Sequence, residues 1–379
     1  MNKDQQLNIL LDILKINTVN GNNNERELAI YIHNKFEEYG IESEVSDVDE
    51  GRSNIIGRIL GKNEEEKIIF NGHLDTVPFG NLEAWNSDPS IPFEEDGKIY
   101  SRGSSDMKSG LAAMLCSFCM ISESKIKPSS TLIFLGTFDE EKNGDGAEAV
   151  LKSGIVDDAT ALIIGEPTYN KVGLAEKGCI WLKSNVRGKT SHSAYPEKGV
   201  NAIEMTFKLY EKLKSYVKQF NNELLGPATV SLNKIDGGVA SNMVADSCVS
   251  LFDIRPVLPL NSEMLLHHLD EISDELKNEF IDCKMQFSLE NDRRPLEVNK
   301  NEKYVQKFSD MVEVVTQRKV EYVGINFFSD GSILAKNDYS LPIFLFGPGN
   351  PELAHQPNEN VEVLKYYQAI EIYFKFMQK

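Results

Sequence analysis

The sequence predicts an α/β fold in which a main α/β domain, a mixed sheet flanked by helices, is interrupted by a smaller ferredoxin-like α+β domain. Two observations point to it. Short apolar segments typical of buried strands alternate with helical segments at both ends of the chain, which is the pattern of an α/β domain. Between them, residues 177–290 follow a different order of strands and helices. We therefore expect the main domain at 1–176 and 291–379.

The first half of the main domain opens with two helices and continues with strands. Leu7, Leu10 and Leu14 recur at helical spacing, and the second helix stops at Gly40, a residue type that commonly ends helices. The strands are short apolar runs rich in β-branched and aromatic residues. The predicted helices are 5–16, 24–39 and 107–122, and the predicted strands are 41–47, 54–60, 67–71, 131–138 and 161–165.

The inserted region has the order β-α-β-β-α-β, which is the ferredoxin-like layout. Its predicted strands are 178–187, 228–236, 247–255 and 283–289, and its predicted helices are 200–220 and 262–279. The chain then returns to alternation. There we expect a helix at 301–316, a strand at 320–323, a helix from about Asp330, a strand at 342–346 and a final helix from about Val361.

Composition excludes several classes of partner. The chain has 379 residues and a net charge of −18, which disfavours nucleic acid and anionic membranes as partners. No apolar run reaches membrane-spanning length, and the N-terminus lacks a signal-peptide pattern. The five cysteines are odd in number and scattered, which favours reduced thiols and a cytoplasmic location. Cys116 and Cys119 lie in an apolar helical stretch, so we expect them to be buried.

The strand at 67–71 is followed at once by His73 and Asp75. In open α/β sheets, ligand sites lie beyond the carboxyl ends of the strands. The spacing of these two residues permits a shared pair of ligands, or a ligand with the partner that orients it. For this segment alone, a strand end with a polar turn is the simpler interpretation.

Other predicted strand ends carry acidic residues in the same way. Residues 139–141, Asp-Glu-Glu, follow the most apolar strand, and adjacent carboxylates there need a counter-charge. Glu166 follows the next strand, and Asp106 stands before the helix at 107, where it is either a helix cap or a metal bridge. His355 lies in a loop late in the chain. Each residue has a simple structural explanation, but the gathering of all of them at strand ends favours a site.

The residue types at these ends suit metal ions. Two imidazoles and three carboxylates fit a pair of zinc-like ions that share one carboxylate, and the surplus Glu would then be a base. The chain lacks a G-x-S-x-G elbow and a G-x-G-x-x-G after a strand, and these absences disfavour serine-hydrolase and nucleotide-dependent functions.

The chain contains the six segments GHLDTVP, YSRGSSDMKSG, FDEEKNGDGA, IGEPT, GKTSHSAYP and AHQPNENV. Together, and in this order, they resemble the motifs of the di-zinc amidohydrolases. This metallopeptidase and deacylase family includes acetylornithine deacetylase, succinyl-diaminopimelate desuccinylase and glutamate carboxypeptidase. The tail GPGNPELAHQPNENV looks most like that of the probable succinyl-diaminopimelate desuccinylases of Gram-positive bacteria.

The resemblance implies a role for each strand-end residue around two Zn²⁺ per subunit, for which Co²⁺ or Mn²⁺ can substitute. These roles are one zinc on His73 and Glu166, the other on Glu141 and His355, a bridge from Asp106, orientation of His73 by Asp75, and general acid/base catalysis by Glu140. The chemistry agrees, because paired cations acidify a shared water and a nearby carboxylate can accept its proton.

The inserted domain carries three of the remaining expected site residues, His192, Arg255 and Asn242. The resemblance implies that His192 donates to the oxyanion in the active site of a partner subunit, in a homodimer joined through the inserted domains. A loop histidine that caps the helix near 200 is the alternative. Arg255 suits a substrate carboxylate, with a surface ion pair as its alternative. Asn242 matches a position that contacts the substrate in relatives, and Gly331, in the main domain, is expected to line the pocket.

The implied activity is metal-dependent hydrolysis of the linear amide of an N-acyl amino acid. The first expectation is N-succinyl-LL-2,6-diaminopimelate, which would give succinate and LL-2,6-diaminopimelate for lysine and cell-wall synthesis. Acetylornithine deacetylation and dipeptide hydrolysis are alternatives with the same metal chemistry. An alternative of another class is a metal-binding scaffold that has lost its chemistry, which predicts a loss of Glu140 or His192. Both residues are present.

Overall fold

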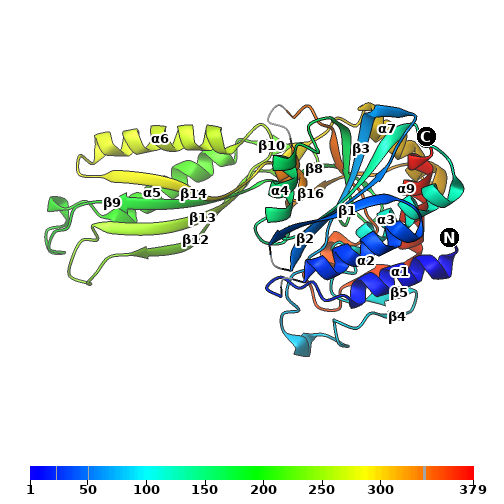
Figure 1. The fold of residues 1–379 in the computed structure, drawn as a ribbon. Helices are drawn as coiled ribbons and strands as arrows, with labels where there is room; N and C mark the ends of the chain where they lie inside the picture. The colour runs from blue at the N-terminus through cyan, green and yellow to red at the C-terminus, as the bar shows by residue number, and fades with distance from the viewer. Residues whose placement is uncertain (23, 50, 336–338) are drawn as a thin grey trace. The chain divides into compact units, whose positions relative to one another are not determined.

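The computed structural model describes residues 1–22, 24–49, 51–335 and 339–379. The chain forms two compact units (Figure 1). The first unit consists of Met1–Leu174, Val298–Val323 and Ser329–Lys379, and the second consists of Ala175–Glu297 with Gly324–Phe328. The second unit is thus inserted in the chain of the first. The predicted insert, 177–290, falls within Ala175–Glu297.

A mixed sheet forms the centre of the first unit, with strand order β1-β2-β6-β3-β7-β17-β8. The central strands β6, β3, β7 and β17 are parallel, whereas β1, β2 and β8 pair antiparallel with their neighbours. The predicted α/β class is therefore confirmed. The strands are β1 Glu42–Asp49, β2 Arg52–Ile59, β3 Asn63–His73, β6 Ser130–Thr137, β7 Ala159–Ile164, β8 Val172–Glu176 and β17 Ile343–Leu345, with β16 Tyr322–Ile325 and β15 Leu296–Glu297 also paired to β8.

Strand register places a row of large apolar side chains on one face of this sheet. Phe70 pairs with Phe134 on one side and with Ile163 on the other, and Ile163 pairs with Phe344. Each fully buried Phe of this row contributes roughly 1.5–3 kcal/mol of burial free energy. Phe118 packs edge-on to Phe70 at a centroid distance of 5.6 Å.

The helices that cover this face come from distant parts of the chain, because α2, α3, α7 and α9 each place an aromatic ring against the row. The helices of the unit are α1 Lys3–Lys15, α2 Glu25–Glu38, α3 Lys108–Ser124, α4 Asp145–Ser153, α7 Lys303–Thr316, α8 Gly331–Leu334 and α9 Val363–Met377. None of the described helices is both long and apolar enough to cross a membrane.

The second unit contains an antiparallel sheet with order β12-β13-β9-β14, and α5 and α6 run along one face of it (Figure 1). Alternate residues of β13 point into the core between sheet and helices, for example Phe252 and Ile254. Asn201 and Asn261 cap the two helices by accepting hydrogen bonds from backbone amides. The elements are β9 Cys179–Arg187, α5 Ala202–Val217, β10 Asn221–Asn222, β11 Gly226–Pro227, β12 Thr229–Gly237, β13 Ser247–Arg255, α6 Ser262–Glu279 and β14 Lys284–Arg293.

The structure adds elements that the sequence pattern does not show. Strand β8 is buried along its whole length, so it lacks the alternation that marks a half-exposed strand. Helix α4 is only nine residues long and rich in small residues. A small sheet joins β4 Phe93–Glu95, β5 Lys98–Tyr100 and β18 Asn360–Glu362. The helix predicted from Asp330 is the short α8, and residues 336–338 beyond it lie outside the described residues.

Candidate metal centre and catalytic site

Three parallel strands of the first unit end at one edge of its sheet. β3 ends with His73, which pairs with Thr137, the last residue of β6, and β7 runs in register with β3 on the other side. Residues just beyond these ends therefore meet at the same edge. Glu140 and Glu141 follow β6, and Glu166 follows β7.

The first group of possible metal ligands consists of His73, Asp106 and Glu166, which offer ligand atoms within 4.8 Å of one another. The Nε2 atom of His73 lies 3.2 Å from Oδ1 of Asp106 and 3.8 Å from Oε1 of Glu166. All three residues are buried. Two carboxylates facing one imidazole nitrogen form a donor set that divalent zinc accepts.

The second group consists of Asp106, Glu141 and His355. Nε2 of His355 lies 2.9 Å from Oε2 of Glu141 and 3.5 Å from Oδ2 of Asp106. Asp106 therefore turns one carboxylate oxygen to each group, which is the arrangement of a carboxylate shared between two cations. The side chain of His355 is 51% exposed, so this group is open to solvent on one side.

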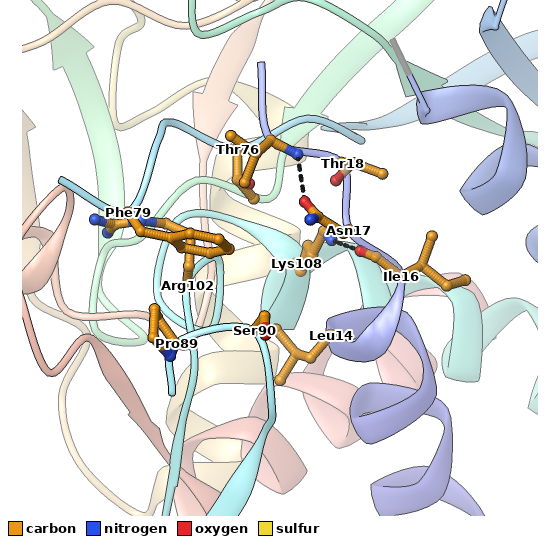
Figure 2. A pocket seen from close by; sticks show the side chains of 11 residues that line it. Leu14, Ile16, Asn17, Thr18, Thr76, Phe79, Pro89, Ser90, Arg102 and Lys108 are labelled. Atoms are coloured by element: carbon orange, nitrogen blue, oxygen red, sulfur yellow. Dashed lines mark hydrogen bonds between the residues drawn. The ribbon is translucent and has the colours of Figure 1, made fainter. Parts of the chain in front are cut away.

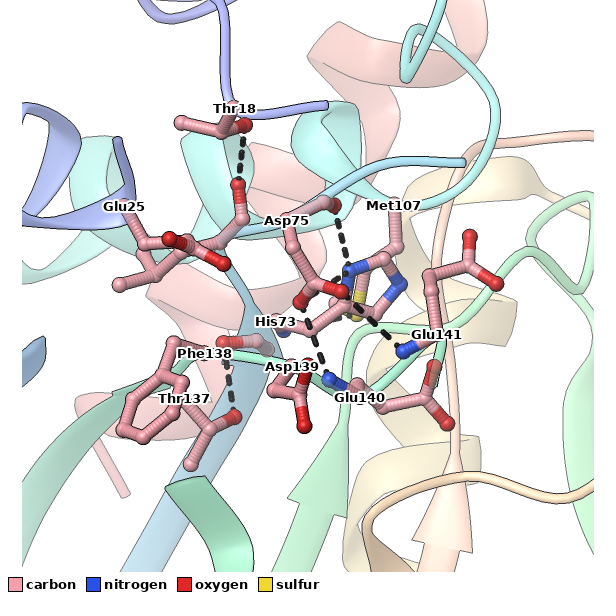
Figure 3. A network of polar contacts seen from close by, with 12 residues as sticks. Thr18, Glu25, His73, Asp75, Met107, Thr137, Phe138, Asp139, Glu140 and Glu141 are labelled. Carbon is pink, nitrogen blue, oxygen red and sulfur yellow. Dashed lines mark hydrogen bonds and ion pairs between the residues drawn. The ribbon is translucent and has the colours of Figure 1, made fainter. Parts of the chain in front are cut away.

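Asp75 contacts both His73 and the loop that carries Glu140 and Glu141, an arrangement that sequence spacing did not reveal (Figure 3). Its backbone oxygen lies 2.9 Å from Nδ1 of His73, whereas its carboxylate oxygen is 3.8 Å away. The carboxylate instead accepts hydrogen bonds from the amides of Glu140 and Glu141, at 3.1 and 3.2 Å, and from the side chain of Asn20 at 2.8 Å. Asp75 thus connects His73 to the loop after β6.

Burial of so many carboxylates shifts their proton affinities. Burial raises the pKa of Glu140 well above its usual range, and the neighbouring charges of Glu166 and Glu141 add to that rise. Burial likewise raises the pKa of Glu141 to about 7. The hydrogen bond with Glu141 raises the pKa of His355 to about 9. Because the cluster holds more carboxylates than cationic groups, it is electrostatically suited to bound cations.

The counter-charge expected for residues 139–141 comes from Arg52 for Asp139 and from His355 for Glu141. The carboxylate of Asp139 accepts a hydrogen bond from Arg52, which also pairs with Glu25 at 3.3 Å. The guanidinium lies 4.7 Å from the ring centroid of Phe138. Asp139 is thereby fixed by Arg52, while Glu140 and Glu141 are left to the site.

The alternative role of Asp106 as a helix cap is wrong. Met107 is the N-cap residue of α3, and the Asp106 side chain contacts His73 instead. The amide of Asp106 donates to Glu359, a buried residue that the sequence reasoning missed. A signal was available, because Glu359 lies in the segment AHQPNENV, four residues after His355.

The predicted residues of the second unit form a separate set. His192 is exposed and forms an isolated bridge with Met243, and the adjacent Ser193 amide donates to the backbone oxygen of Asn242 at 3.0 Å. His192 and Asn242 are therefore neighbours. Nδ1 of His192 accepts from the Ala194 amide at 3.0 Å, and because Asn201 caps α5, the helix-capping alternative for His192 is wrong.

Arg255 and Gly331 occupy less exposed positions. Arg255 donates to both carboxylate oxygens of Asp253, at 2.7 and 3.1 Å, which is the ion pair given above as its alternative role. Gly331 is buried as the first residue of α8 in the first unit. The preceding Asp330 accepts a hydrogen bond from Thr137 at the end of β6. All five cysteines lie among the described residues, where they are buried free thiols.

The two groups of possible metal ligands, which share Asp106, fit a metal-dependent enzyme, and comparison with known proteins gives the family. The model of Peptidase family M20/M25/M40 matches residues 69–379. The chain belongs to this family. The suspected relationship to the metallopeptidases and deacylases is thereby confirmed.

Individual sequence relatives and solved structures match nearly the whole length of this chain. A probable succinyl-diaminopimelate desuccinylase of Staphylococcus aureus is 30% identical over 397 residues, covering 97% of this chain and 96% of the relative. Among solved structures, a tripeptidase from Staphylococcus aureus is similar with a TM-score of 0.79 and 23% identity, covering 100% of this chain and 98% of that one. A dinuclear metal-binding M20 peptidase from Bacillus subtilis is similar with a TM-score of 0.75 and 14% identity, covering 99% and 97%.

Proposed function

We propose that this member of the family hydrolyses the amide bond of an N-acyl amino acid, with N-succinyl-LL-2,6-diaminopimelate as its substrate. The products are succinate and LL-2,6-diaminopimelate. The observation that carries the hydrolytic proposal is Asp106, whose two oxygens face two separate ligand groups beside Glu140. The choice of acyl group rests on the name of the sequence relatives that match over 97% of the chain.

The donor set fits two Zn²⁺ ions, and Co²⁺ or Mn²⁺ are acceptable substitutes. The two groups contribute two imidazoles and three carboxylates, so their three negative charges balance most of the charge of two divalent cations. His73 and Glu166 would hold one ion, Glu141 and His355 the other, and Asp106 both. When bound, the ions supply Lewis acidity, which lowers the pKa of a shared water and polarises the amide carbonyl.

Glu140 supplies the proton transfer in this proposal. It is buried beside the ligand groups without belonging to either of them. Its carboxylate takes a proton from the attacking water and gives it to the leaving nitrogen as the C–N bond breaks.

Residues of both units would supply substrate contacts. His192 would donate to the oxyanion in the site of a partner subunit, in a homodimer joined through the inserted units. Asn242, its neighbour, would contact the substrate beside it. Arg255 would bind a substrate carboxylate by exchanging its present partner Asp253, and Gly331 would line the pocket.

The experiment is hydrolysis by the zinc-loaded protein of N-succinyl-diaminopimelate, N-acetylornithine and a panel of dipeptides and tripeptides. A preference in kcat/KM for the succinylated substrate supports the proposal. A preference for acetylornithine or for peptides contradicts the proposed succinylated substrate and leaves the proposed roles of the residues in hydrolysis unchanged. Two bound metals without cleavage of any amide would favour a metal-binding scaffold instead.

A further inference from the structure

One buried carboxylate joins the two loops that meet at the metal centre. Oε1 of Glu359 accepts hydrogen bonds from the amides of Ser105 and Asp106, at 2.8 and 2.9 Å. Its Oε2 accepts from the amide of Gly103 at 3.1 Å and from the guanidinium of Arg102 at 2.6 Å. Glu359 is fully buried. All four donors belong to the loop that presents Asp106.

Further contacts run between the same two segments. The Ser101 amide donates to the backbone oxygen of Glu359 at 3.2 Å, and Arg102 also donates to the backbone oxygen of Gln356, next to His355, at 3.4 Å. The loop with Asp106 and the segment with His355 therefore hold one another, with Glu359 at the centre of the contacts.

Arg102 is itself held from several sides, so it cannot follow a displaced partner. It donates to the backbone oxygen of Pro78 at 3.3 Å and lies 5.0 Å from the ring centroid of Trp85. Arg102 and Lys108 line a cavity beside the loop (Figure 2). The space open to the centre of a water molecule there is only about 10 Å³, so this side of the loop holds at most a water and no amino-acid substrate.

The two ligand groups depend on these contacts to different degrees. In the first group, His73 closes β3 and Glu166 follows β7, so the hydrogen bonds of the sheet hold both. In the second group, Asp106 and His355 are both carried by the loops that Glu359 joins. Only Glu141 of that group is carried by a strand end, that of β6. Its amide also donates a hydrogen bond to Asp75, which follows β3.

We propose that Glu359 is a positioning residue that sets the affinity of the second metal, the one between Asp106, Glu141 and His355. This inference rests on the two-metal site of the proposed function. Glu359 contacts no ligand atom, and it acts through the backbone that carries Asp106 and the segment that carries His355. Loss of its charge releases the two loops from one another and leaves the sheet-borne ligands in place.

The decisive variant is Glu359→Gln. The amide has the same shape, but its NH₂ group must face either the backbone amides or Arg102, which are themselves donors. Zinc binding to the metal-free protein is measured by competition with a chromophoric chelator, and bound zinc is counted by mass spectrometry. We expect two sites in the natural protein. In Glu359→Gln we expect the zinc affinity of the tighter site to stay within about threefold of its natural value. The zinc affinity of the weaker site should fall about 10–100-fold.

Glu66→Gln is the matched control. Glu66 also accepts hydrogen bonds from several groups, Ser130, Lys303 and Tyr304, but it lies towards the opposite end of β3 from His73. This variant should keep both zinc affinities. Arg102→Lys is the second test variant, which keeps the charge but loses the planar fork, and it should weaken the same site by a smaller factor.

The outcomes separate this inference from the proposed function. Two zinc sites of natural affinity in Glu359→Gln overturn the inference and leave the two-metal hydrolase standing. Equal weakening of both sites also overturns it, because the effect is then not confined to the second metal. Fewer than two sites in the natural protein contradict both proposals. If Glu359→Gln fails to fold, Arg102→Lys decides, and an unchanged second site in it overturns the inference.

Discussion

The two units of this protein carry their polar residues in opposite ways. In the first unit, His73, Asp106 and Glu166 are at most 7% exposed and lie where strands and loops converge. In the second unit, His192 and Asn242 are exposed on a pair of loops. Buried carboxylates are costly unless donors or cations compensate them, whereas exposed polar loops cost little. The buried carboxylates of the first unit therefore need compensating donors or cations, whereas the exposed residues of the second unit can remain hydrated.

The most severe test of the first unit is Glu140→Ala. We expect kcat to fall by about 10²–10⁴-fold because the proton acceptor is lost. Zinc content should stay at the natural value, since Glu140 belongs to neither ligand group. Glu141→Gln is the neighbouring control, and it should lose zinc as well as activity. Substantial turnover by fully loaded Glu140→Ala would show that the base lies elsewhere.

His192→Ala tests whether the second unit acts on a partner. We expect kcat to fall by about 10²–10³-fold, as for other oxyanion donors. Mixing it in equal amounts with Glu140→Ala should restore about a quarter of natural activity, because half the dimers of a two-fold assembly are then mixed and each has one complete site. Tagged subunits show that exchange has occurred. Exchange without recovered activity would contradict action across subunits.

Asp75→Asn measures how much the hydrogen bonds of the Asp75 carboxylate contribute to zinc affinity and activity. The carboxylate of Asp75 accepts from three donors, and the amide of Asn would point a donor at one of them. We expect a loss of about 10–100-fold in zinc affinity or kcat/KM. Asn20→Ala removes one donor and leaves the other two, so its loss should be smaller. Equal effects would indicate that Asn20, and not the β6 loop, sets the position of Asp75.

The strand-end residues were predictable because two local signals coincide there. An apolar run marks β3 or β6, and the polar residues after it are delivered to the sheet edge by strand geometry. The mixed sheet and the two-helix insert were predictable for the same reason. Strand β8 was not, since a strand that is buried throughout has no alternation.

Contacts between distant loops were beyond the sequence pattern. Glu359 is separated from the loop at 102–106 by more than 250 residues of sequence. The Nδ1 atom of His73 lies closer to the backbone oxygen of Asp75 than to its carboxylate, a difference that residue spacing does not reveal. For His192, the sequence motif marks the residue, and the mixing experiment above tests the proposed action on a second subunit.

Glu66→Gln gives the smallest expected effect and separates stability from activity. The hydrogen bond from Lys303, with that from Tyr304, lowers the pKa of Glu66 to about 2. A carboxylate with a lowered folded pKa stabilises the fold above its unfolded pKa, near 4.3, and loses that contribution as the pH falls towards 2. Glu66→Gln should therefore lower Tm by a few degrees, roughly 2–4 °C, near pH 6, and the difference should shrink steadily below pH 4. Thermal melts of both proteins from pH 6 to pH 3 measure this. A difference that stays constant with pH would show that packing, and not the charge of Glu66, stabilises the end of β3 away from the metal centre.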